Sequence, residues 1–86
     1  MPEISRFLGI VISINFDDHP PPHFHVRYGE QRATVNIAPL ALQDGELSPR
    51  ALGLVIEWAS QHRPELRENW NRARRHEKLV PIKPLE

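Results

Sequence analysis

Hydrophobic and polar residues alternate through much of the first half of the chain. Between residues 10 and 16 an apolar side chain occupies every second position, which predicts a strand with one buried face. β-Branched and aromatic residues upstream extend this predicted strand over 4–16. The same period of two recurs over 23–28 and 31–38. The pattern therefore predicts three strands.

A short turn between the second and third predicted strands determines how they pair. Gly29 and Glu30 have the composition of a two-residue hairpin turn with glycine first. This turn pairs apolar residues with apolar ones and polar residues with polar ones: Phe24 with Val35, Val26 with Ala33, His23 with Asn36, His25 with Thr34, and Arg27 with Arg32. A slip of one residue would destroy this match, so the register is well specified.

The second half of the chain has helical periodicity. Ser48 followed by Pro49 is typical of a helix start, with serine as the N-cap and proline at the first helical position. The apolar positions that follow predict helices over 48–62 and 64–76, and the tail over 79–85 is expected to be extended, with the option of a short edge strand.

These elements predict one α+β domain over residues 1–86. A three-stranded antiparallel sheet would carry both helices on one face, followed by the extended C-terminal tail. Trp58 and Trp70 lie on the apolar stripes of the two helices, so we expect both in the core.

Composition excludes several classes of protein. The 86 residues contain no cysteine, which excludes disulfides and thiolate metal sites. The formal net charge is zero, unlike that of a strongly basic nucleic-acid binder, although residues 48–86 carry eight basic and five acidic side chains. No apolar run reaches membrane-spanning length, and the N-terminus lacks a signal-peptide pattern. We therefore expect a cytoplasmic protein with no membrane partner.

Histidines and arginines gather on the predicted polar face of the sheet. Three of the five histidines lie within seven residues of one another. The side chains that would project from the uncovered face include His23, His25, Arg27 and Arg32. Arg27 directly opposite Arg32 is destabilising unless an anion lies between them. Three interpretations of this face remain open.

The first interpretation is a metal site. His23 and His25 are two residues apart on a strand, so their side chains point the same way, about 7 Å apart, and could converge on one ion. Asp17, Asp18 or His19 would supply a third ligand, and zinc accepts such sets of nitrogen and oxygen atoms. The neighbouring arginines count against this interpretation because they repel a cation.

The second interpretation is a phosphate site that needs no cofactor. One of His23 and His25 would be the base and the other the acid of a metal-independent phosphodiester cleavage. Arg27 and Arg32 would stabilise the charge on the phosphate. Binding of RNA or DNA without cleavage is an equal alternative.

The third interpretation is purely structural. The prolines at 20–22 require a rigid turn, in which Asp17 or Asp18 would cap backbone amides. The two histidines that follow would then pack on their neighbours and hydrogen-bond to Thr34 or Asn36.

A basic stripe on the second predicted helix is a separate candidate for nucleic-acid binding. Arg67, Arg74 and Lys78 recur at helical spacing and form one face that could follow a nucleic-acid backbone. Acidic residues interleave with them, so a solvated helix face explains the same pattern. An exposed apolar stripe near Trp70 would instead serve to dock a neighbouring protein.

Several segments together resemble a known family of small bacterial proteins. They are 1–7, 16–19, 21–26, 28–30 and 82–85, with Leu47, Arg50, Ala51, Leu52, Val55, Glu57, Trp58, His62, Leu66, Asn69 and Trp70 in the helical half. The chain is similar to domain of unknown function 4160 over nearly its whole length. Proteins of this kind are often encoded next to, or fused to, another small uncharacterised domain.

The resemblance implies a component of a two-gene, toxin–antitoxin-like or regulatory module. Its expected partners are a small protein encoded nearby, RNA bound through the histidine and arginine face, and a second copy in a homodimer. The alternatives are a zinc-binding module that uses His19, His23 and His25, and a pure protein-interaction domain without chemistry. The resemblance transfers no catalytic residues to this chain.

Overall fold

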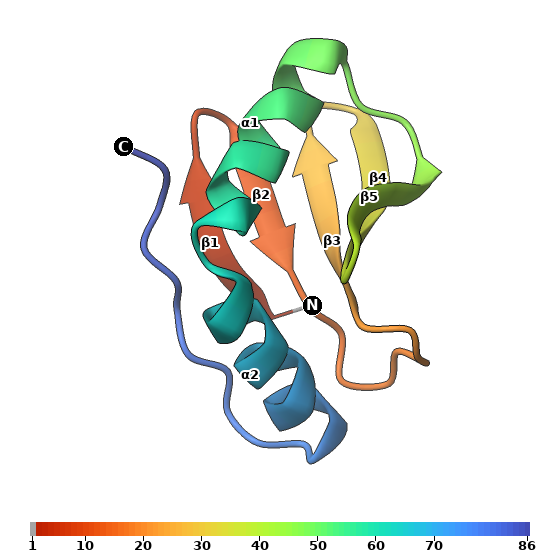
Figure 1. The fold of residues 1–86 in the computed structure, drawn as a ribbon, viewed down its shortest axis with the longest axis vertical. Coiled ribbons are helices and arrows are strands. Elements are labelled where there is room, and N and C mark those ends of the chain that lie inside the picture. Colours follow the sequence, from red (N-terminus) through yellow and green to blue (C-terminus); the bar gives the residue numbers. More distant parts are fainter. Residues whose placement is uncertain (1) are drawn as a thin grey trace.

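The computed structural model describes residues 2–86 and shows an α+β fold (Figure 1). Five strands form one antiparallel sheet in the order β1-β2-β3-β4-β5. They are β1 (Glu3–Phe7), β2 (Ile10–Ser13), β3 (His23–Tyr28), β4 (Gln31–Ile37) and β5 (Leu40–Gly45). Two helices, α1 (Pro49–Ser60) and α2 (Arg63–Arg74), follow and pack against one face of the sheet.

The sheet has five strands, whereas the alternation predicted three. The predicted strand over 4–16 is two strands, because Leu8 and Gly9, with φ of 51° and 81°, turn the chain back into a hairpin. Gly9 alone indicates a bulge or bend, but a leucine with positive φ is uncommon, so the residue types did not predict a full reversal of the chain. The fifth strand, β5, is exposed along most of its length and lacks the alternation on which the prediction depended.

The predicted pairing of β3 with β4 is confirmed at every position. Phe24 faces Val35 within the core, and His25 faces Thr34 on the opposite side of the sheet. Gly29 begins the connecting turn with a φ of 59°, a value that glycine adopts without steric cost. The turn therefore determines which side chains of β3 are covered by the helices and which remain open.

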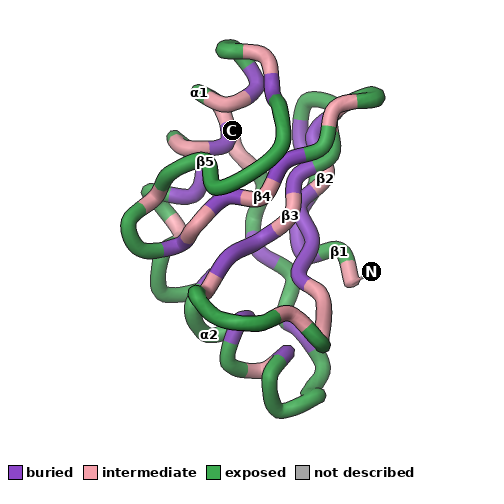
Figure 2. The backbone as a smooth tube through the Cα atoms, turned by 90° about the vertical axis from the view of Figure 1, so that its right-hand side faces the viewer, coloured by how far each residue is buried: buried purple, intermediate pink, exposed green. Residues whose placement is uncertain are grey.

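Trp58 of α1 links the helices to the sheet. It is fully buried, and its ring centroid lies 5.4 Å from that of Phe7 in β1 and 6.0 Å from that of Phe24 in β3. Its indole Nε1 donates a hydrogen bond of 2.9 Å to the carbonyl oxygen of Lys83, which satisfies the buried nitrogen. Figure 2 shows the corresponding pattern: buried positions follow β2, β3 and β4, while β5 is exposed.

The two helices agree with the prediction except at their ends. The Ser48 hydroxyl accepts a hydrogen bond of 3.2 Å from the Ala51 amide, as expected of the N-cap of α1. The second helix ends at Arg74, two residues earlier than predicted. Within residues 2–86 no helix combines the length and apolar character that crossing a bilayer requires.

The C-terminal tail crosses α2 and reaches β1 (Figure 1, blue). Asn69, which is 1% exposed, holds it through two hydrogen bonds of 2.8 Å to the backbone of Val80. The Ile82 amide then donates to the carbonyl oxygen of Ile4 at 2.7 Å. The tail thus remains an extended segment, with Leu79 and Ile82 buried, and forms no regular edge strand.

Replacing Gly45 should test how closely β5 packs on β4. An alanine Cβ there would lie 2.3 Å from the Arg32 carbonyl oxygen and 2.7 Å from the Ala33 Cα, at a φ of +87°. We expect Gly45→Ala to lower the free energy of unfolding by more than about 1 kcal/mol, because backbone must move. In α1, Gly53→Ala meets nothing within 4 Å and should raise it by about 0.5–1 kcal/mol. Urea unfolding measures both changes, and a Gly45→Ala variant as stable as wild type would contradict the expectation.

Candidate functional site

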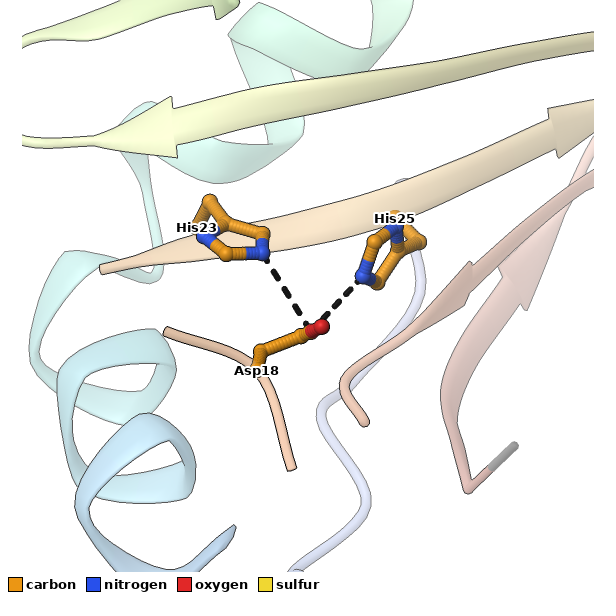
Figure 3. Close-up of side chains that lie close together, drawn as sticks. All are labelled: Asp18, His23 and His25. Atoms are coloured by element: carbon orange, nitrogen blue, oxygen red, sulfur yellow. Dashed lines mark hydrogen bonds and ion pairs between the residues drawn. The ribbon is translucent and has the colours of Figure 1, made fainter. Parts of the chain in front are cut away.

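Asp18, His23 and His25 form a compact group at the start of β3 (Figure 3). The loop between β2 and β3 carries Asp18, and both histidines belong to β3. One nitrogen of each histidine and one carboxylate oxygen lie within 4.8 Å of one another. We call this group the Asp–His cluster. Its two imidazole rings are perpendicular, with centroids 5.2 Å apart.

The His23 ring is held in one orientation from two sides. Its Nδ1 lies 2.7 Å from the carbonyl oxygen of Pro21, which can only accept, so Nδ1 carries a hydrogen. The ring also packs on Trp70 of α2, with centroids 5.1 Å apart, and its side chain is only 10% exposed. In the neutral ring the lone pair is therefore on Nε2, which points at Asp18 Oδ2 from 3.3 Å. Two acceptors face each other there unless a proton or a cation lies between them.

His25 points its Nε2 at the same carboxylate oxygen. The distance from Nε2 to Asp18 Oδ2 is 2.7 Å, which is that of a strong charge-assisted hydrogen bond. The amide nitrogen of Asn15 is 3.3 Å from the same Nε2, and the Asn15 backbone amide donates to Asp18 at 3.4 Å. The shorter contact decides the arrangement, so in the metal-free protein His25 donates to Asp18.

The carboxyl group of Asp18 is ionised over the ordinary pH range. Its partial burial acts to raise its pKa. The hydrogen bond from His25 and the charges of His25 and His23 act in the opposite direction and prevail, so the pKa lies below its ordinary value of 3.8. The cluster therefore has a permanent negative charge at its centre, facing two nitrogen atoms.

Next to the Asp–His cluster, the uncovered face of the sheet forms a hollow of about 510 Å³. Cross-strand partners along its floor make a polar row over all five strands: Glu3, Ser13, His25, Thr34 and Asp44. Two residues along the strands from this row, Arg27 and Arg32 face each other in register. The imidazole of His25 thus belongs both to the cluster and to the lining of the hollow.

Three of the four residues proposed for catalysis line the hollow, and the fourth does not. His25, Arg27 and Arg32 line the hollow, whereas His23 is buried against Trp70 and does not. The histidines also do not use the partners expected of a purely structural role. Their hydrogen bonds go to Asp18 and Pro21 rather than to Thr34 or Asn36.

Three of the five candidate metal ligands lie together in the Asp–His cluster, and Asp17 and His19 lie outside it. The third ligand atom belongs to Asp18 and not to His19, which is exposed and lies outside the group. The Asp17 side chain is 93% exposed, and its carboxylate lies 3.9 Å from the Nε2 of His76. A zinc site built from His19, His23 and His25 therefore does not match this geometry.

The predicted basic stripe on the second helix is shorter than expected. Arg67 and Arg74 are exposed on α2, but the helix ends at Arg74, so Lys78 does not continue the stripe. Trp70 is 4% exposed: the His23 ring packs on it, and the Arg74 guanidinium carbon lies 5.9 Å from the centroid of the Trp70 ring. The apolar stripe near Trp70 is consequently not open for docking.

Sequence reasoning missed the groups that orient the cluster and those that border the hollow. The Pro21 carbonyl and the Trp70 ring have no local signal, because both contacts depend on how the loop and α2 meet β3. Glu3 and Asp44 belong to β1 and β5, which the prediction did not include as separate strands, so neither was recognised as part of the polar row. A five-strand prediction would have found them, since cross-strand partners of His25 then follow from the register.

Substituting Asp18 should change how stability depends on pH. Because the folded-state pKa of Asp18 is depressed, its contribution is complete above about pH 3.8 and is lost as pH falls through the lower folded-state value. We expect Asp18→Asn to cost more stability at pH 6 than at pH 3, in protein treated with a chelator. Denaturant unfolding at the two pH values measures the difference, and a pH-independent cost would show that the ion pair contributes nothing.

Comparison with known proteins gives a family and nothing beyond it. The profile of the family described as Domain of unknown function (DUF4160) matches residues 9–71, a span that contains the Asp–His cluster, Arg27 and Arg32. Neither the curated proteins nor the solved structures gave a match. Since the matched span is well over half of the 86 residues, the chain belongs to the DUF4160 family.

Proposed function

We propose that the protein is a zinc-binding module in which Asp18, His23 and His25 supply three ligands. The observation that carries the proposal is the orientation of His23. A hydrogen bond from Nδ1 to a backbone carbonyl, with Nε2 left to face a carboxylate, is the arrangement in which metal-binding histidines are usually held. A cation between Nε2 and Asp18 would remove the repulsion between two acceptors.

The distances in the cluster are close to those that zinc requires. Bonds of about 2.0–2.1 Å at tetrahedral angles separate ligand atoms by about 3.3–3.4 Å. The separation of His23 Nε2 from Asp18 Oδ2 is already 3.3 Å, and that of His25 Nε2 from the same oxygen is 2.7 Å. Binding would lengthen the 2.7 Å contact through a shift of His25 or Asp18, both of which are partly exposed, and would draw together the two histidine nitrogens, which lie within 4.8 Å of each other.

Three protein ligands leave one coordination position for water or a substrate. The ionised carboxylate of Asp18 supplies negative charge that offsets the arginines nearby, which was the objection to a metal from sequence alone. A zinc-bound water in that position would be available as a nucleophile near neutral pH. His25 lines the hollow, so a ligand bound there would lie next to the metal.

Zinc binding should stabilise the fold and depend on Asp18 and His25. Protein stripped with a chelator should take up one zinc per chain. At a free zinc concentration about 100 times the dissociation constant, the free energy of unfolding should rise by about 2.7 kcal/mol. Metal analysis after dialysis, with thermal unfolding in zinc and in chelator, measures both effects in tag-free protein.

Matched histidine variants separate this site from chance binding. His25→Ala and Asp18→Asn should lose the zinc and the thermal shift, while His19→Ala and His76→Ala should keep both. His23 is packed against Trp70, so its substitution would destabilise the fold as well as remove a ligand, and a loss of zinc could then have either cause. No zinc above background in wild type, or equal uptake by the His25→Ala variant, would overturn the proposal.

A second candidate is an RNA-directed component of a two-gene, toxin–antitoxin-like module. The opposed Arg27 and Arg32 favour it, together with the 2.7 Å hydrogen bond by which Asp18 orients His25 beside them. In a metal-independent cleavage His25 would be the base, and the two arginines would stabilise charge on the phosphate. The acid would be a group other than His23, because His23 does not line the hollow.

Expression in a bacterial host tests this second candidate. Induced wild-type protein should slow growth, and His25→Ala should not, because it lacks the base. His76→Ala removes an exposed histidine outside the cluster and should act like wild type at matched soluble levels. Unimpeded growth with the wild type would remove the toxic role, and arrest by His25→Ala would remove His25 from the mechanism.

A further inference from the structure

We infer that the hollow on the uncovered sheet face binds a phosphorylated ribose, either in a free ribonucleotide or in an RNA strand. The inference deepens the second candidate above, whose arginines it shares, and it does not depend on zinc at the Asp–His cluster. Its basis is the juxtaposition of Arg27 and Arg32 with the polar row that ends in a carboxylate on either side.

The two arginines form a site for an anion. They are exposed, directly opposite each other on neighbouring strands, and neither has an ion pair within residues 2–86. Like charges in directly opposed positions destabilise a sheet, and a phosphate between two guanidinium groups would convert the repulsion into charge-assisted hydrogen bonds. The Thr34 hydroxyl lies about 7 Å farther along the strand from Arg32 and could donate to the same ligand.

The ends of the polar row indicate what the rest of the ligand carries. Asp44 on β5 has no ion pair within the described part of the chain, and Glu3 on β1 is held by Arg6 at 2.8 Å. Two carboxylates would repel a ligand that placed phosphate groups against the whole polar row. They suit a ligand whose other polar groups are hydroxyls, because a carboxylate accepts hydrogen bonds from hydroxyl groups. A phosphate joined to a sugar has both kinds of group.

The shape of the hollow agrees with a ligand of this size. Its volume of about 510 Å³ is within the range of small-molecule sites. Gly45 allows β5 to approach β4 closely, which places Asp44 at the rim of the hollow opposite Thr34. The carboxylates that would accept from the sugar thus lie at the two ends of the row that contains Thr34, and the arginines that would hold the phosphate lie two residues along the strands from that row.

Titrations in chelator, with no metal present, test the inference independently of zinc binding. The probes are uridine monophosphate, its deoxy counterpart, inorganic phosphate and a short single-stranded oligoribonucleotide. We expect Arg27→Ala/Arg32→Ala to weaken nucleotide binding at least tenfold. The control Arg50→Ala/Arg63→Ala removes two equally exposed charges elsewhere and should change binding less than twofold.

A second variant tests the role assigned to the sugar. Wild type should prefer the ribonucleotide over the deoxynucleotide at least threefold, and Asp44→Asn should abolish this preference by strengthening binding of the deoxy probe. Tighter binding of the oligoribonucleotide than of the mononucleotide would identify an RNA strand as the source. In that case the slope of the logarithm of the binding constant against the logarithm of salt concentration should become shallower by about 0.7 for each phosphate contact that a substitution removes. Tighter binding of the mononucleotide would identify the free nucleotide.

Three results would overturn the inference. They are no binding by folded wild type, equal binding by the Arg27→Ala/Arg32→Ala variant, and inorganic phosphate binding as tightly as the nucleotide. The arginine variant should remain folded, because it relieves a like-charge contact at two exposed positions. Loss of nucleotide binding with zinc binding retained in that variant would separate this site from the metal site.

Discussion

The register of β3 against its neighbours is the constraint on which the rest of the structure depends. The two-residue turn at Gly29 sets Phe24 and Val26 against apolar partners beneath the helices. The same turn sets His25 and Arg27 on the opposite side. A shift of one position would bury guanidinium and imidazole groups under α1, and a buried unpaired charge costs far more than a hairpin can supply. The core and the candidate site are therefore two results of one pairing.

One oxygen atom of Asp18 has a comparable role within the site. Both histidines point at it, one from 2.7 Å and the other from 3.3 Å, while the Pro21 carbonyl and Trp70 prevent the His23 ring from turning away. A carboxylate in this position compensates the neighbouring arginines and directs two imidazoles at the same point. Metal binding and acid–base chemistry both need that geometry, so the choice between them depends on what lies between the oxygen and the His23 nitrogen.

The parts of the structure that local chemistry determines could be predicted from the sequence. The β3–β4 pairing followed from a turn and an alternation, and the start of α1 from Ser48 and Pro49. Parts that depend on a single backbone angle or on distant contacts could not. Leu8 at positive φ divides one predicted strand into two, and the burial of Asn69 depends on a tail that begins several residues after α2. In the site, the two histidines lie two residues apart on one strand, so the sequence predicts that their side chains point to the same side of the sheet. Which residue faces them, Asp18 or His19, depends on the path of the proline-rich loop and could not be predicted.

The two edges of the sheet differ in how open they are to strand addition. Asn69 and the Ile82–Ile4 hydrogen bond hold the tail along β1, while β5 has no strand beyond it in residues 2–86. A sheet with two open edges can extend indefinitely by adding copies edge to edge. A sheet with one open edge can join only one other copy, β5 against β5, which uses both free edges and produces a closed two-fold pair. The tail occupies part of the β1 edge, so a strand added there would first have to displace it, whereas a strand added at β5 would not.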